Sequence, residues 1–228
     1  MFIKPIKTFS FLTFSIILSA CNNENSPKKQ TSAVAGQKQV AATPAPKKEI
    51  KTYDGPFGLT MGISIETLTK DFGFTSDNKE PLLFNGTPPK PSNFFTSYLI
   101  FAGKKTGLCR IAAFTESLEF NDSGDEIKSK ADKIAEALSV KYGKAKNYDY
   151  GNEYTKADLW ALSADHGNAK YSHEWDKKTG QGFSEGLESI SVDVVPQDFR
   201  TGFVIVSYDF DNFTECQKEK AELNSSNL

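Results

Sequence analysis

Apolar residues recur at helical spacing in two stretches that also carry the signals of helix ends. The first helix is predicted to begin after Ser64, a favoured N-cap residue, and to end before Gly73, a residue type common just past helix ends. A longer helix is predicted over residues 124–142, where apolar side chains recur at helical spacing. Ser123 and Glu126 stand in the arrangement of a capping box at its start.

Alternation of apolar and polar residues predicts a series of short strands. They span residues 97–103, 108–115, 157–163, 169–175, 187–195 and 203–210, and a turn at 104–107 joins the first two as a hairpin. Ile190 and Val192 alternate with Ser189 and Ser191, which is typical of a sheet with one face toward water.

These elements predict a single α+β domain over residues 53–224, with an antiparallel sheet and helices packed on one face. Both predicted helices end on an aromatic residue followed by glycine, which suggests two related halves, each a helix followed by strands. Residues 74–96 are rich in proline and irregular. The aromatic residues within 81–96 either form a binding loop or pack under the edge of the domain.

The N-terminal segment has the layout of a secretory signal over residues 1–20. Lys4 and Lys7 precede an uncharged run of about a dozen residues, too short to span a bilayer core that needs roughly 20. Leu18-Ser19-Ala20-Cys21 closes this run and resembles the lipobox of bacterial lipoproteins. In that family the cysteine receives a diacylglycerol and becomes the first residue of the mature chain, which implies lipidation of Cys21. The alternative is an ordinary signal followed by an incidental cysteine.

Residues 21–52 show no apolar periodicity and are rich in Ala, Pro, Lys and Gln. Such a segment cannot bury enough surface to offset its ordering entropy, so a disordered tether is predicted. The chain has a formal net charge of −2 and lacks the clustered Lys and Arg of a nucleic-acid-binding protein. No nucleic-acid partner is therefore expected.

Two cysteines remain beyond Cys21. Cys109 lies on a predicted strand, on the face shared by Ile111 and Ala113, and Cys216 shares the inner face of a last predicted helix with Phe213. That helix is predicted to follow Asn212, which with Glu215 fits a cap, and to run to about residue 223. An even pair in an oxidising compartment favours a Cys109–Cys216 disulfide over two separate buried thiols.

The two histidines are the first place to look for metal chemistry. His166 lies in a predicted turn, and His173 lies on a predicted strand beside Glu174. Adjacent strand residues point to opposite faces, so Glu174 leaves the face that His173 occupies. The spacing of the two histidines, with Asp165 included, matches no compact metal motif. No metal site and no cofactor are predicted.

Catalytic motifs are also missing from the sequence. It contains no nucleophile elbow, no phosphate-binding glycine loop and no dinucleotide-binding glycine motif. A hydrolase that uses two carboxylates stays open as an alternative, with Asp193, Asp198, Asp209 and Asp211 as examples of available acids. No catalytic residue is predicted.

One predicted strand face is unusually aromatic. Tyr171, His173 and Trp175 alternate along it, and Trp160 lies on the strand before it. This face is either part of the core or an exposed patch of the composition that protein interfaces enrich. We take these four residues as the candidate partner-binding site.

The start of the domain, Gly58-Leu59-Thr60-Met61-Gly62-Ile63-Ser64-Ile65-Glu66, leads into a helix that ends in Phe72-Gly73. This stretch resembles the first helix of bacterial envelope lipoproteins of the SmpA/OmlA kind. It is also similar to the repeats of the β-lactamase-inhibitor-protein-like fold. Both resemblances imply a small binding or assembly protein and not an enzyme. Asn22 differs from the aspartate of the inner-membrane retention signal in enteric bacteria, so the analogy implies an outer-membrane anchor that faces the periplasm.

The sequence therefore predicts a lipid-anchored envelope lipoprotein with a non-catalytic, protein-binding or structural role. Its expected partners are the membrane, through Cys21, and another envelope protein. An inhibitor that captures a hydrolase is the first alternative, by analogy with the inhibitor-like fold.

Overall fold

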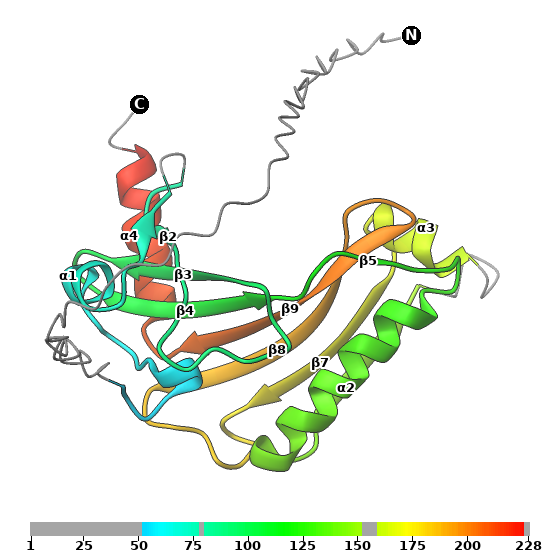
Figure 1. The fold of residues 1–228 in the computed structure, drawn as a ribbon, viewed down its shortest axis with the longest axis horizontal. Coiled ribbons are helices and arrows are strands. Elements are labelled where there is room, and N and C mark those ends of the chain that lie inside the picture. Colours follow the sequence, from blue (N-terminus) through cyan, green and yellow to red (C-terminus); the bar gives the residue numbers. More distant parts are fainter. Residues whose placement is uncertain (1–51, 78–79, 152–158, 226–228) are drawn as a thin grey trace, which may run out of the picture. The chain divides into compact units, whose positions relative to one another are not determined.

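One antiparallel sheet organises the part of the chain that the structure describes (Figure 1). In this computed structural model the described residues are 52–77, 80–151 and 159–225. The predicted signal at 1–20, Cys21 and the predicted tether up to residue 51 lie outside them. All described residues belong to one compact unit, Lys47–Leu228.

Among the described residues the sheet has nine strands in the order β1-β2-β3-β4-β9-β8-β7-β6, with β5 paired to the first two residues of β9. Their bounds are β1 Thr75–Ser76, β2 Leu83–Asn85, β3 Ser97–Gly103, β4 Gly107–Phe114, β5 Leu118–Glu119, β6 Lys146–Tyr150, β7 Lys170–Asp176, β8 Leu187–Pro196 and β9 Thr201–Phe210. The helices are α1 Ile65–Lys70, α2 Asp125–Tyr142, α3 Trp160–Asp165 and α4 Phe213–Ser225, with a short 3-10 turn at Pro56–Gly58. The predicted α+β class with an antiparallel sheet is confirmed.

The first two α-helices begin where the sequence predicts, but α2 is capped differently. Thr67 N donates to the Ser64 side chain at the start of α1, 3.2 Å away. At α2, Asp125 N donates to Asn121 Oδ1 at 3.0 Å, and Asn121 N donates to Glu126 Oε2 at 2.9 Å. The predicted Ser123 cap is therefore wrong, because the Ser123 hydroxyl donates to the Asn121 side chain instead.

The face of the sheet toward α2 forms the core. Helix α2 contacts β7, β8 and β9, and alternate residues along these strands are buried. The buried set includes Ile111, Trp175, Ile190, Val192, Val206 and Tyr208 from the sheet and Ile127, Ala131 and Ile134 from α2. Leu68 of α1 joins the same core.

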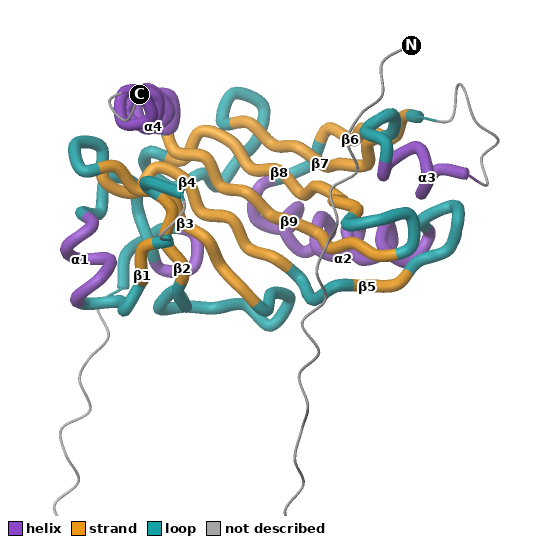
Figure 2. Tube along the Cα trace, turned by 90° about the horizontal axis from the view of Figure 1, so that it is seen from above, coloured by secondary structure: helices purple, strands orange, loops and turns teal. Residues whose placement is uncertain are grey.

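Helix α4 lies on the other face, against β3 and β4. The Arg110 guanidinium stacks over the Phe213 ring, 3.8 Å from its centroid, and Lys220 Nζ lies 5.4 Å from the Phe101 ring centroid. Phe101 and Arg110 alternate with core residues such as Ile111, so α4 approaches from the side opposite α2. Figure 2 shows α2 and α4 over different strands of the sheet. The sequence predicted that the helices pack on one face of the sheet, whereas α4 packs on the face opposite α2.

The predicted disulfide between Cys109 and Cys216 is present and joins β4 to α4, with the two Cα atoms 6.4 Å apart. The register of β3 and β4 shifts between Phe101 and Ala102, so that Ala102 pairs with Leu108 and Cys109 has no partner residue on β3. Cys109 therefore turns toward α4 and does not share the core face of Ile111, as simple alternation predicted.

One predicted strand was wrong, and one strand of the structure was not predicted. The strand predicted at 157–163 lies partly outside the described residues, and from Trp160 onward the chain forms α3. The strand β6 was missed because all five of its residues are exposed and none shows apolar alternation. Within the described part of the chain, no helix combines the length and apolar composition needed to cross a membrane.

Candidate functional site

The aromatic face predicted to bind a partner is buried. Trp160 is 1% exposed on α3, while His173 and Trp175 on β7 are 6% and 2% exposed. Tyr171 is partly buried, and Trp175 Nε1 donates to the Gly143 carbonyl at 2.8 Å. The alternation of β7 points these side chains toward α2, which covers them. The prediction of an exposed patch is therefore wrong, and the alternative, a core face, describes these residues.

Polar groups under α2 are paired around His173. Its Nε2 lies 2.9 Å from Asp132 Oδ1, and its Nδ1 lies 2.9 Å from Asn147 Oδ1. Tyr171 donates its hydroxyl to the same Asp132 oxygen at 2.7 Å. Burial and this bond to a carboxylate raise the pKa of the Tyr171 hydroxyl. The cluster fastens β6 and β7 to α2.

The His173 cluster does not have the arrangement of a catalytic triad. His173 also lines a small cavity of about 190 Å³. Among the residues that line this cavity, Ser139 is the one with a hydroxyl that could serve as a nucleophile. Ser139 donates instead to the Ala135 carbonyl at 2.8 Å, and both ring nitrogens of His173 are already engaged. No nitrogen is left to act as its base.

The histidines do not converge on a metal site. His166 Nδ1 lies 2.8 Å from the Leu162 carbonyl at the end of α3, whereas His173 is held by Asp132 and Asn147. Among the described residues, no three His, Cys, Asp or Glu side chains are placed to hold a metal ion together.

The face of the sheet opposite α2 is accessible over β7, β8 and β9, and we call it the open face. Strand register places on it Phe114, Glu174, Asp176, Ser191, Phe203, Ile205 and Ser207. These side chains are partly exposed, whereas Ser172, which the register places on the same side of β7, is fully buried. Toward one end of the strands the open face is apolar, with the Phe114 and Phe203 rings 5.7 Å apart. Toward the other end it is polar.

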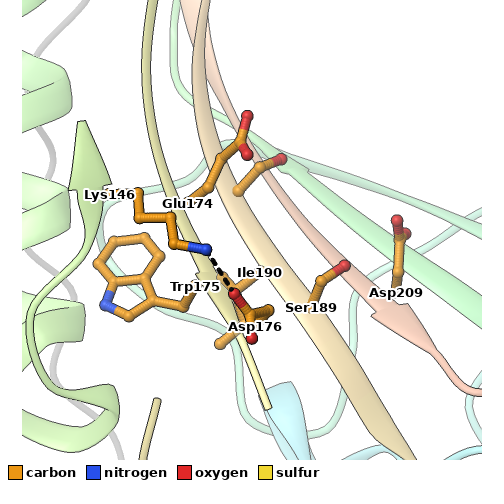
Figure 3. A pocket seen from close by; sticks show the side chains of 8 residues that line it. Lys146, Glu174, Trp175, Asp176, Ser189, Ile190 and Asp209 are labelled. Atoms are coloured by element: carbon orange, nitrogen blue, oxygen red, sulfur yellow. Dashed lines mark hydrogen bonds and ion pairs between the residues drawn. The ribbon is translucent and has the colours of Figure 1, made fainter. Parts of the chain in front are cut away.

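The polar end of the open face contains a shallow pocket of about 250 Å³ (Figure 3). Lys146 reaches across from β6 and bonds Asp176 at 3.0 Å. The other lining residues are Glu174, Trp175, Ser189, Ile190, Ser191 and Asp209. Hydrogen bonds from Lys146 and Thr179 lower the pKa of Asp176 to about 2. The same bond raises the pKa of Lys146. Both groups are therefore charged near neutral pH, and a carboxylate with this pKa is not suited to act as a general acid.

Each of the four carboxylates named as candidates for a hydrolase contacts a different partner. Asp209 forms a bidentate pair with Arg110, Asp211 bonds Lys177 at 2.5 Å, and Asp193 lies 4.0 Å from Lys170. Asp198 accepts from the backbone of Arg200 and Thr201 in the turn between β8 and β9, at 2.7 Å each. Each acid is explained by a structural contact.

The proline-rich segment 81–96 packs most of its aromatic residues against the domain. Phe84 is 5% exposed on β2, and the Phe95 ring contacts Phe57 and Tyr98. Phe94 is 40% exposed. The alternative of a packed loop therefore describes most of this segment. The structure points instead to the open face as the candidate site. The sequence indicated this face only through the polar residues that alternate with apolar ones along β8.

Comparison of the chain with family models, with curated proteins and with solved structures found no match in any of the three.

Proposed function

We propose that this chain is a lipid-anchored lipoprotein of the bacterial envelope, outer-membrane and periplasm-facing, that binds another protein without catalysing a reaction. The anchor rests on the signal-like segment and the lipobox-like sequence that ends at Cys21. The disulfide that fastens α4 to the sheet supports an oxidising compartment, because such bonds persist there and are rare in the cytosol.

One observation carries the binding role: the open face is a broad, accessible sheet surface of mixed composition. Phe203, Ile205 and Phe114 supply an apolar patch toward one end of the strands, and polar and charged residues such as Glu174 lie toward the other end. Apolar residues beside polar ones are typical of protein interfaces. A protein partner with an apolar protrusion beside polar groups would complement this surface.

The binding role is tested by a pull-down of the lipidated protein after in-cell crosslinking. Ile205→Arg places a charge in the apolar patch of the open face, and we expect it to abolish capture of the partner. Val140→Arg is the matched control, since Val140 is 84% exposed on α2. Equal capture by both variants, with unchanged melting temperatures, contradicts the proposal.

The anchor is tested separately by Cys21→Ser. We expect the wild-type protein to fractionate with the outer membrane and to carry the mass of a lipid. The variant should keep neither property. A variant that stays in the membrane fraction with the same mass as the wild type contradicts lipidation.

An inhibitor that captures a hydrolase is the second candidate, and the order of the strands favours it. The sheet reads β1-β2-β3-β4 from one edge and β6-β7-β8-β9 from the other, and the two series meet where β4 pairs with β9. Helix α1 precedes one series and α2 the other. This order supports two related halves, the arrangement that the resemblance to the β-lactamase-inhibitor-protein-like fold implies.

This second candidate predicts stoichiometric inhibition. Increasing amounts of the purified protein, added to a β-lactamase or another envelope hydrolase, should reduce its activity linearly to a breakpoint at one inhibitor per enzyme. Full activity at a several-fold excess over each enzyme tested rejects that enzyme as the target.

A further inference from the structure

The outer edge of the sheet, strand β6, is accessible for further pairing. β6 pairs only with β7, and all five of its residues are exposed. Within the described residues, the backbone of residues 146–150 forms no backbone–backbone hydrogen bond except with β7. Groups that point away from β7 therefore offer donors and acceptors to another strand.

Two of the devices that usually protect a sheet edge, a bulge and a proline, are missing from β6, although it carries the charged residues Lys146 and Asp149. Its register with β7 runs without a shift from Lys146↔Glu174 to Tyr150↔Lys170, so no bulge twists it away. It contains no proline, and two of its five side chains, Tyr148 and Tyr150, are exposed aromatics. The opposite edge, β1, is only two residues long. Among the described strands at the two edges, β6 is thus the one that is long and regular enough to accept a further strand.

We propose that β6 pairs antiparallel with β6 of a second copy of this chain, about a two-fold axis at Tyr148. The sequence Lys146-Asn147-Tyr148-Asp149-Tyr150 is compatible with itself in this register. Lys146 lies opposite the partner's Tyr150, Asn147 lies opposite the partner's Asp149, and Tyr148 meets its own copy. These are cation–aromatic, hydrogen-bonding and aromatic pairs, and no like charges are opposed.

The proposed pairing also fixes how the open faces of the two copies are oriented. Lys146 and Tyr148 lie opposite Glu174 and Ser172 on β7, so they are on the open-face side. A two-fold axis perpendicular to the sheet keeps the open faces of both copies on the same side. Two binding surfaces would then face one direction, although the pairing itself does not depend on what the open face binds. Five paired residues form a small interface, so the dimer is weak and depends on concentration.

The two-fold register is tested by Tyr148→Cys in the full-length protein in its native membrane. Opposite residues in antiparallel strands have Cα atoms about 4.5–5.5 Å apart, within the range a disulfide needs. Mild oxidation should therefore give a covalent dimer on a non-reducing gel. Val140→Cys, on exposed helix surface, is the control and should stay monomeric. No dimer from Tyr148→Cys, or a crosslink to a different protein, overturns the proposal.

A charge swap tests the same register without a crosslink. Asn147→Asp places a carboxylate opposite the partner's Asp149 twice per dimer, so the dimer Kd of the detergent-solubilised full-length protein should rise about tenfold. Adding Asp149→Asn to that variant restores one charge per pair and should return the Kd to near the wild-type value. Sedimentation measures both. A wild-type protein that is monomeric at every concentration, or a double variant as weak as the single one, contradicts the pairing.

Discussion

Asp176 shows how single residues support the polar end of the open face. Its carboxylate accepts hydrogen bonds from Lys146 Nζ at 3.0 Å, from the Thr179 hydroxyl at 2.9 Å and from the backbone of Lys178 and Thr179. These bonds favour the charged form and lower its pKa from 3.8 to about 2. One side chain thus closes the turn after β7 and attaches β6 through Lys146.

The sign of this pKa shift predicts a pH dependence of stability. Because the folded pKa is below the unfolded value, the stabilisation is complete above about pH 4 and is lost as the pH falls to about 2. Asp176→Asn should therefore lower the melting temperature at pH 7 and make little difference near pH 2. Thermal unfolding across this range measures it. A difference that stays constant with pH contradicts the account, and Glu185→Gln, an exposed carboxylate, is the control.

Alanine substitutions at two glycines with the same φ angle distinguish the cost of backbone strain from the cost of steric crowding. Gly124 and Gly73 both have φ +73. A Cβ on Gly124 would lie 2.4 Å from a Trp160 ring atom, whereas a Cβ on Gly73 would meet nothing within 4 Å. Gly73→Ala should cost about 1 kcal/mol for the left-handed backbone alone. Gly124→Ala should cost about 1–3 kcal/mol more for overpacking. Chemical denaturation measures both, and equal losses contradict the packing of α3 against α2.

Helix α4 is the element whose position depends most on specific polar and covalent contacts. Besides the disulfide, its buried Glu219 accepts from Lys104 N at 2.7 Å and from the Thr106 hydroxyl at 3.2 Å. Asn212, just before the helix, donates to the Thr106 and Leu108 carbonyls. Asn212 was predicted as a helix cap, and its side chain instead attaches the helix start to the β3–β4 turn.

Removal of the disulfide tests how α4 is held. The bond spans 107 residues, and the chain-entropy estimate for such a loop is about 4–5 kcal/mol. Cys109→Ser combined with Cys216→Ser should therefore lower the free energy of unfolding by up to this amount. Hydrogen exchange should also rise in α4 while α2 stays protected. Denaturation with and without reductant measures the wild-type bond, and identical midpoints would show that it does not form.

Elements with an apolar face could be predicted from the sequence, and elements without one could not. The strands β3, β4, β8 and β9 and the long helices α2 and α4 follow from their periodicity and end signals. β6 could not be predicted, because a strand exposed on both faces has no apolar alternation. The alternation of β7 indicated an aromatic face, but the sequence does not show which face of the strand α2 covers. For this reason the sequence could not decide whether the aromatic residues belong to the core or to a binding surface.

At the scale of the whole domain, the sheet divides the described residues into two unlike sides. The α2 side is a continuous apolar core, while on the opposite side α4 docks on β3 and β4 and residues of β8 and β9 such as Ser191, Phe203 and Ile205 stay partly exposed. A sheet with an accessible mixed face, joined by a polar segment to a proposed lipid anchor, is suited to hold a partner near a membrane. This division also explains why the predicted aromatic site failed: its side chains belong to the covered side.

The most direct test of this account is site-specific photo-crosslinking in living cells, with a photoreactive residue at position 205 or at position 140. Position 205 lies on the open face, and position 140 lies on the exposed surface of α2. We predict one discrete adduct from position 205 and none from position 140. No adduct at position 205 and at its neighbour 207, or the same adduct from both sides of the sheet, would contradict binding through the open face.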